Sequence, residues 1–191
     1  VLMHTLERFA GQCDSITLVM HADYIAHWET LCKEYNFTVP HTVVAGGVTR
    51  ADSVLNGLKH LAPESLVAVH DAVRPFVFPT LIDQLFVAAA EHGSAIPVVP
   101  IKDTLRLLDD SGSTTVDRSR YRAVQTPQVF VTGLLQAAFK HPAYSEFTDE
   151  ASLYEAVGHK AFLVAGDDRN IKLTVPADLI VAETFCGMFN V

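Results

Sequence analysis

Apolar and polar positions along this chain follow two periods, one typical of strands and one typical of helices. Four short runs are apolar through their length, as expected of buried strands, and they cover residues 15–20, 42–45, 66–70 and 95–99. Segments with apolar residues three or four apart predict amphipathic helices at residues 24–35, 50–61 and 79–92, and a similar spacing of Leu2, Leu6 and Phe9 opens the chain. This alternation predicts a doubly wound α/β domain with a mainly parallel sheet.

The alternation stops between residues 101 and 124. This segment has no helical period, and the sequence Asp-Asp-Ser-Gly-Ser at 109–113 is a strong turn signal. We interpret the segment as a β-hairpin arm inserted between core elements. Because an isolated hairpin is marginally stable in water, we expect the arm to pack on a partner subunit. The core pattern then resumes, with predicted helices at 132–140, 149–157 and 176–185 and predicted strands at 161–165 and 171–174.

Composition narrows the class of protein. The 191 residues fit one domain, and a chain of this length buries a full core without disulfides or metal staples. The 22 acidic and 14 basic residues give a formal charge of −8, so we expect no nucleic-acid partner. Three widely separated cysteines are typical of reduced thiols and of a cytoplasmic protein. No apolar stretch is long enough to predict a membrane span.

Polar residues that follow the predicted strands are the first candidates for chemistry, since ligands of such sheets bind beyond the carboxyl ends of the strands. Gly46 and Gly47 join a strand to a helix whose first turn carries Arg50 and Ser53. Glycines permit close approach of a ligand to the backbone, and a helix N-terminus favours an anion. The alternative is an ordinary tight turn with Thr49 or Asp52 as a helix cap.

Asp71 follows the third strand and is expected beside Arg74. A single carboxylate at this position suits Mg²⁺, which takes one or two protein carboxylates and completes its shell with phosphate and water. Arg74 would act as an anion clamp or as the ion-pair partner of Asp71. The alternative is a structural Asp–Arg pair in a loop, and His70 is interpreted as a hydrogen-bonded, partly buried residue rather than a general base.

Three further groups carry charge or hydroxyls. Arg118, Arg120 and Arg122 would share one face of a strand, where they suit either an anion or a solvated surface. Thr148 or Asp149 would cap the helix that follows, and Thr148 would also direct its hydroxyl towards a ligand. Lys172 lies at the start of a predicted strand, just after a turn. It is either a cation positioned for a ligand or an ordinary solvated side chain.

Five segments occur in the same order as in one enzyme family. They are AGGVTRADSVLNGL (45–58), VHDAVRPFV (69–77), VDRSRYRAVQTPQVF (116–130), TDEAS (148–152) and NIKLTVPADL (170–179). Through them the chain resembles the 2-C-methyl-D-erythritol 4-phosphate cytidylyltransferases over essentially its whole length. The resemblance implies a Rossmann-like nucleotidyltransferase domain that transfers CMP from CTP to the polyol phosphate, releases pyrophosphate and needs Mg²⁺.

The resemblance also implies roles for particular residues. Those expected to hold the cytosine and ribose of CTP are Gly47, Val48, Arg50 and Ser53. Asp71 is expected to bind the metal, and Arg118 and Lys172 to be the catalytic residues that position the substrate phosphate. The remaining substrate-binding residues would be Ala72, Arg74 and Thr148. Family members are homodimers, so the arm is expected to reach the site of the partner subunit.

One departure from the family pattern leaves alternatives open. The family begins with a strand, a Gly-rich loop and a Lys that hold the triphosphate, whereas this sequence begins after them. We therefore expect residues 1–191 to form a single domain that lacks an N-terminal βα unit of about 30 residues. The alternative functions are a ribitol 5-phosphate cytidylyltransferase, which shares two of the segments, a nucleotidyltransferase that uses another base, and a nucleotide-binding module without catalysis.

Overall fold

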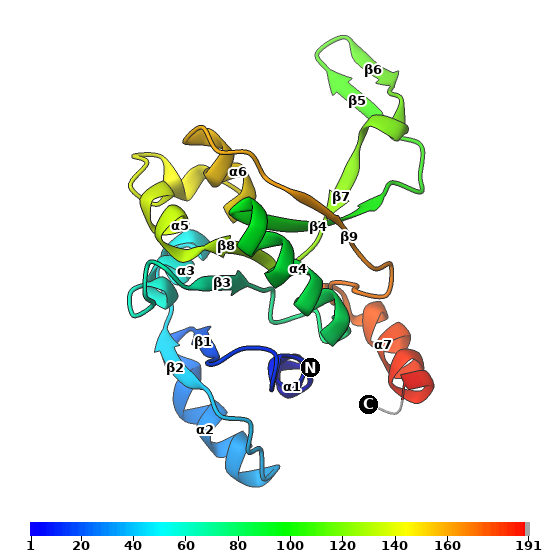
Figure 1. The fold of residues 1–191 in the computed structure, drawn as a ribbon. Helices are drawn as coiled ribbons and strands as arrows, with labels where there is room; N and C mark the ends of the chain where they lie inside the picture. Colours follow the sequence, from blue (N-terminus) through cyan, green and yellow to red (C-terminus); the bar gives the residue numbers. More distant parts are fainter. Residues whose placement is uncertain (190–191) are drawn as a thin grey trace.

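The computed structural model describes the backbone of residues 1–189 and the side chains of residues 1–187 (Figure 1). Its α-helices are α1 (Leu2–Phe9), α2 (Ile25–Glu34), α3 (Arg50–Leu58), α4 (Pro79–His92), α5 (Thr132–Ala138), α6 (Glu150–Ala156) and α7 (Pro176–Phe189). Its strands are β1 (Thr17–Met20), β2 (Thr42–Ala45), β3 (Leu66–Val69), β4 (Ser94–Pro100), β5 (Arg106–Asp109), β6 (Gly112–Thr115), β7 (Arg122–Val124), β8 (Gln128–Val131) and β9 (Leu163–Ala165). Single 3-10 turns lie at Ala22–Tyr24, Arg118–Arg120 and Tyr144–Glu146. All seven predicted helical segments therefore contain a helix.

Within each sheet, the predicted strands that form run in the same direction, and β1 and β2 make up a two-stranded sheet separate from the central one. β1 pairs in parallel with β2, and β9 pairs in parallel with β4. β3 and β4 both pair antiparallel with β8, so they run in the same direction as each other. β8 itself is not among the predicted strands, and with β7 it forms the antiparallel part of the central sheet. The α/β class is confirmed, with this mixed central sheet as a refinement.

Alternate residues of the central strands pack against helices on opposite faces. Ala95 of β4 and Val129 of β8 lie in a cluster with the apolar face of α4. Their neighbours Ile96 and Phe130 lie in a second cluster with side chains of α3, α5 and α6. Because successive side chains of a strand point to opposite faces, the sheet is buried on both sides and the domain is doubly wound.

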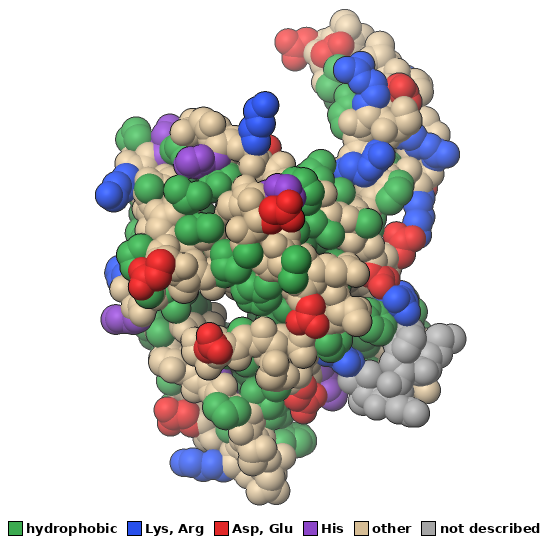
Figure 2. Space-filling model, in the orientation of Figure 1, with side chains coloured by type: hydrophobic (Ala, Val, Ile, Leu, Met, Phe, Trp, Pro, Cys, Tyr) green, Lys and Arg blue, Asp and Glu red, His purple; other side chains and the backbone are tan. Residues whose placement is uncertain are grey.

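The segment 101–124 forms the predicted hairpin. β5 and β6 pair antiparallel, all eight of their residues are exposed, and the hairpin extends away from the body of the domain (Figure 1). Figure 2 shows several basic side chains gathered on this arm. The hairpin is therefore confirmed, while its role in dimerisation stays a prediction.

Two local predictions are wrong. Arg118 and Arg120 do not share a strand face with Arg122, because Asp117 accepts a hydrogen bond from the Ser119 N–H at 3.0 Å and starts a 3-10 turn. Residues 171–174 do not form a strand either. The Leu173 N–H donates to the Val73 carbonyl at 2.9 Å, but Val73 lies in a loop, and the Ile171 N–H donates to the nearby Arg169 carbonyl at 2.8 Å. Among the described residues, no helix is long and apolar enough to cross a membrane.

Candidate active site

The loop between β2 and α3 is fixed by its own hydrogen bonds. Thr49 caps α3 by accepting from the Asp52 N–H, and the Asp52 carboxylate accepts from the Thr49 N–H, both at 3.0 Å. The Gly47 N–H donates to Ser53 Oγ at 3.0 Å. A Cβ on Gly47 would lie 2.2 Å from that of Asp52, so this close turn requires glycine. Of the two caps considered for this helix, Thr49 or Asp52, the structure has Thr49 as the N-cap, and the loop leaves the Val48 side chain 99% exposed.

Three basic side chains surround Asp71, which follows β3. Asp71 Oδ2 lies 3.2 Å from Lys172 Nζ and 3.4 Å from Arg74 Nε, and Oδ1 lies 3.9 Å from Arg50 Nη2. We call these four residues the Asp71 cluster. Its members come from three segments of the sequence, with Asp71 and Arg74 in the same loop, and they meet beyond the carboxyl ends of β2 and β3, where the α/β topology predicts a binding site.

The three cations set the charge of Asp71. Burial by itself would raise the pKa of this carboxyl, whose side chain is 15% exposed, but the surrounding cations together outweigh burial and lower the pKa below its usual value, with Lys172 contributing both a hydrogen bond and a charge. The charges of Arg50 and Arg74 act in the same direction. Asp71 is therefore an ionised carboxylate at neutral pH, as a metal ligand must be.

Lys172 reaches Asp71 because the segment around it is bound to the loop after β3. Arg74 Nη1 donates to the Asn170 carbonyl at 2.7 Å, and the buried Asn170 amide donates to the Thr126 carbonyl at 2.8 Å. Gln125 binds the same segment by donating to the Asp167 carbonyl at 2.8 Å. The predicted pairing of Arg74 with Asp71 is thus accompanied by a second contact, which sequence reasoning did not anticipate.

His70 lies between these loops and is neutral. Thr126 Oγ1 accepts from the Asp71 N–H at 3.0 Å and lies 3.1 Å from His70 Nδ1, while His70 Nε2 lies 3.1 Å from the Arg74 carbonyl. Nε2 therefore carries the proton and donates to the carbonyl, and the Thr126 hydroxyl donates to Nδ1. Burial lowers the pKa of His70 to about 4. Its interpretation as a hydrogen-bonded structural residue agrees with this geometry.

Arg50 has a second partner that the sequence did not reveal. Its Nη1 and Nη2 donate to the two carboxylate oxygens of Glu150 at 2.7 and 2.9 Å. Burial acts to lower the pKa of Arg50, but its bonds to Glu150 raise the pKa overall, so the guanidinium stays charged. Glu150 lies in the first turn of α6, and no local sequence signal links it to a residue 100 positions away.

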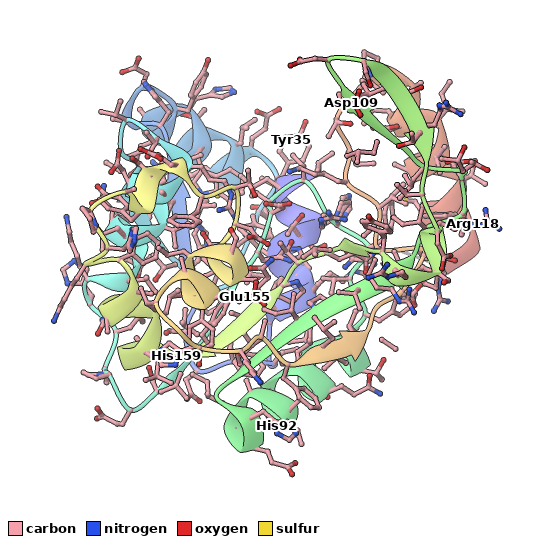
Figure 3. All side chains as sticks on the ribbon, turned by 90° about the horizontal axis from the view of Figure 1, so that it is seen from above. Tyr35, His92, Asp109, Arg118, Glu155 and His159 are labelled. Carbon is pink, nitrogen blue, oxygen red and sulfur yellow. The ribbon has the colours of Figure 1, made fainter. Side chains whose placement is uncertain are left out.

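The other predicted site residues lie outside the Asp71 cluster. Thr148 is exposed and directly precedes Asp149, which is the residue that caps α6. The Ala72 carbonyl accepts from the Thr5 hydroxyl of α1 at 2.7 Å. Arg118 lies in the arm, where its guanidinium donates to the Lys102 carbonyl, and Figure 3 shows it near the hairpin that carries Asp109. Within one chain, the structure does not bring Arg118 to Asp71.

The donor set at Asp71 fits a cation that takes few protein ligands. Among the described residues, no group of three or more His, Cys, Asp or Glu side chains is arranged to hold a metal ion. Asp71 Oδ1 is more loosely engaged than Oδ2, which contacts both Lys172 and Arg74. One ionised carboxylate oxygen is the kind of ligand that Mg²⁺ combines with phosphate and water.

Comparison with known proteins identifies the family. The sequence model of the 2-C-methyl-D-erythritol 4-phosphate cytidylyltransferases matches residues 1–187. The chain belongs to this family. The enzyme of this name from Porphyromonas gingivalis is 47% identical over 184 residues, covering 96% of this chain and 83% of the relative. That of Phocaeicola vulgatus is 45% identical over 185 residues, covering 96% of this chain and 84% of the relative.

Solved structures of the family share the fold. The 4-diphosphocytidyl-2C-methyl-D-erythritol synthase of Anaerococcus prevotii superposes with a TM-score of 0.85 at 32% identity, covering 97% of this chain and 85% of the other. The 2-C-methyl-D-erythritol 4-phosphate cytidylyltransferase of Thermus thermophilus superposes with a TM-score of 0.80 at 31% identity, covering 96% and 87%. The resemblance that the five sequence segments carry is therefore confirmed at the level of both sequence and fold.

Proposed function

We propose that this cytidylyltransferase transfers CMP from CTP to 2-C-methyl-D-erythritol 4-phosphate. A phosphate oxygen of the polyol phosphate attacks the α-phosphorus of CTP, a new P–O bond forms, and the bond to the β-phosphate breaks to release pyrophosphate. Membership of the family over residues 1–187 carries this proposal. The names of the relatives favour this substrate over ribitol 5-phosphate.

The loop after β2 is proposed to hold the nucleoside. Val48 is exposed at this loop, and Arg50 begins the helix that follows, with part of its guanidinium open to solvent. Gly47 and Ser53 fix the turn through their mutual hydrogen bond. The exposed apolar side chain suits the flat face of a base. The backbone N–H groups at the N-terminus of the helix suit the hydroxyls of a ribose.

The cations of the Asp71 cluster are proposed to bring two anions together. Transfer between a triphosphate and a phosphate monoester is opposed by charge repulsion, so fixed cations and correct orientation supply much of the catalysis. Lys172 is 46% exposed and held by Asp71, and we assign it to the substrate phosphate with Arg118. Arg74, Ala72 and Thr148 are assigned to the same pocket.

Asp71 is proposed to hold Mg²⁺. Its ionised carboxylate would bind the ion through Oδ1, and the ion would take up negative charge of the triphosphate when bound. Arg50, Arg74 and Lys172 contribute positive charge at the same place without a metal, and they keep the carboxylate ionised for it.

The arm is proposed to complete the site of a partner subunit. It extends from the domain (Figure 1), its exposed residues include Leu107 and Leu108, and its Arg118 donates to the Lys102 carbonyl rather than to Asp71 of its own chain. An exposed two-stranded hairpin with apolar residues is typical of a surface that packs on another subunit. The relation of this chain to an N-terminal βα unit and the cytoplasmic location stay predictions.

The assay of this function uses the full-length protein with CTP, Mg²⁺ and the polyol phosphate, and it follows pyrophosphate release. We expect 2-C-methyl-D-erythritol 4-phosphate to be used in preference to ribitol 5-phosphate when both are present at equal concentration. Preference for the ribitol substrate would support the alternative function, and CTP binding without turnover would support a binding module.

Lys172→Ala provides the sharpest test of the site. We expect kcat to fall about 100-fold, because a fixed cation that stabilises the transition state is lost. Lys33→Ala on the exposed face of α2 is the matched control and leaves kcat unchanged. An unchanged rate for Lys172→Ala would refute the role assigned to this lysine.

A further inference from the structure

One buried carboxylate beside the site has no role in the proposed reaction. The side chain of Glu150 is only 2% exposed, and both of its oxygens accept hydrogen bonds from Arg50. Burial of a carboxylate is unfavourable unless the charge is paired and hydrogen-bonded. A bidentate pair also fixes the plane of the guanidinium, so Glu150 determines how Arg50 is oriented.

The position of Glu150 is itself fixed from two sides. Asp149 caps α6 by accepting from the Ser152 N–H at 3.0 Å. Gln128 of β8 is 1% exposed, donates to Asp149 at 2.7 Å and accepts from the Ala151 N–H at 3.0 Å. The first turn of α6 is therefore bound to a central strand, and Glu150 is a rigid partner for Arg50.

Two carboxylates compete for the same guanidinium. Arg50 Nη2 lies 2.9 Å from Glu150 Oε2 but 3.9 Å from Asp71 Oδ1. Without the charge of Glu150, the guanidinium would be free to turn onto Asp71. That movement would engage the Asp71 oxygen that Lys172 and Arg74 leave open, and it would take Arg50 out of its half-exposed orientation.

We propose that Glu150 is a positioning residue, which holds Arg50 off Asp71 and in the orientation that receives the nucleotide. Glu150 does not contact the substrate in this arrangement and acts only through Arg50. The inference rests on the proposed function, because it takes CTP as the ligand that Arg50 meets. It explains why a buried acidic residue lies next to a site that binds polyanions.

The first test measures CTP binding to the full-length protein by calorimetry, with Mg²⁺ and without the polyol phosphate, so that no turnover occurs. We expect Glu150→Gln to weaken CTP binding about tenfold, the effect of losing one charged hydrogen-bond partner. Glu150→Asp keeps the negative charge, so we expect a smaller loss of CTP affinity than in Glu150→Gln. The matched control is Glu155→Gln, an exposed glutamate on the same helix (Figure 3), which leaves the affinity unchanged.

A double-mutant cycle separates positioning from a general structural effect. If Glu150 acts through Arg50, then Arg50→Ala and Arg50→Ala/Glu150→Gln bind CTP equally weakly. The proposal would be overturned if Glu150→Gln reduced CTP affinity by the same factor in the wild-type protein and in Arg50→Ala. It would also be overturned if the affinity of the single variant Glu150→Gln were unchanged. Should Glu150→Gln fail to fold in a thermal melt, the same cycle is run with Glu150→Asp.

Steady-state kinetics supply a second readout. We expect Glu150→Gln to raise KM for CTP and to leave KM for the polyol phosphate unchanged, whereas loosening of the whole site would raise both. Failure of the wild-type protein to bind CTP would refute the proposed function. Wild-type binding with no change in Glu150→Gln would refute only the role of Glu150.

Discussion

His70 shows how a single buried residue holds the loops of the candidate site together. Its two ring nitrogens join the Arg74 carbonyl to the Thr126 hydroxyl, and the same hydroxyl accepts from the Asp71 N–H. The ring also packs against Phe9 of α1, with the ring centroids 4.9 Å apart. A neutral imidazole in this place holds two loops together, and its protonation would leave a charge in a buried environment.

This arrangement predicts a pH dependence of stability. The unfolded chain binds a proton at His70 below about pH 6.5, whereas the folded chain binds it only below about 4. Stability is therefore lost as the pH falls through this window, by roughly 3 kcal/mol in total. Urea unfolding between pH 7 and 5 measures the effect above the range where the carboxylates titrate.

His70→Gln tests the assignment, because it removes the titrating group. We expect the variant to be less stable at pH 7 but to show a flatter dependence on pH than the wild-type protein. His27→Gln, at an exposed position on α2, is the control and keeps the wild-type slope. A wild-type slope in His70→Gln would show that another group titrates in this window.

At the scale of elements, local signals predicted the helices better than the strands. The predicted bounds of α4 agree with the structure because Pro79 occupies the first turn and Gly93 ends the helix with a φ of 84°. β8 was missed because it begins with a polar residue, Gln128, whose burial depends on partners in α6. The strand predicted at 171–174 failed because strand formation requires a neighbouring strand, and its neighbour Val73 lies in a loop.

In the candidate site as well, residues with a local sequence signal were predicted and residues that depend on distant partners were not. Asp71, Arg74 and Lys172 each lie in a short local motif, so the sequence alone indicated them as candidates. Glu150 and Asn170 act through partners far away in the sequence, and a single sequence contains no signal for such pairs. The sequence therefore predicted the charged groups of the site, but not the residues that orient them.

The cap of α3 is the element whose loss is easiest to measure. Thr49→Ala removes the acceptor of the Asp52 N–H and one half of a capping box, so we expect a loss of about 1 kcal/mol in urea unfolding. CTP binding is expected to weaken as well, because the same turn positions Arg50. Thr30→Ala removes a hydroxyl from the exposed middle of α2 and is the control. Equal stability of the two variants would contradict the role of the cap.

At the scale of the whole molecule, the groups proposed to be catalytic lie on two parts of the chain, the domain and the arm. The Asp71 cluster lies at the carboxyl ends of β2 and β3, while Arg118 lies on an arm that extends from the domain (Figure 1). The proposed function therefore predicts a site shared between the subunits of a dimer, in which each arm contributes Arg118 to the partner. In a symmetric dimer each subunit would give its Arg118 to the other, so two sites would form that each contain Asp71 of one subunit and Arg118 of its partner.

Mixing of inactive variants tests this shared site. Arg118→Ala and Asp71→Asn are each expected to be nearly inactive alone. After unfolding and refolding together, half of the dimers are mixed and each has one site with both residues, so about a quarter of the wild-type activity returns. As the control, Arg118→Ala refolded with the double variant Asp71→Asn/Arg118→Ala recovers nothing, because no subunit then supplies the arginine. If each arm served its own chain, the first mixture would also stay inactive, since every subunit would lack one of the two residues.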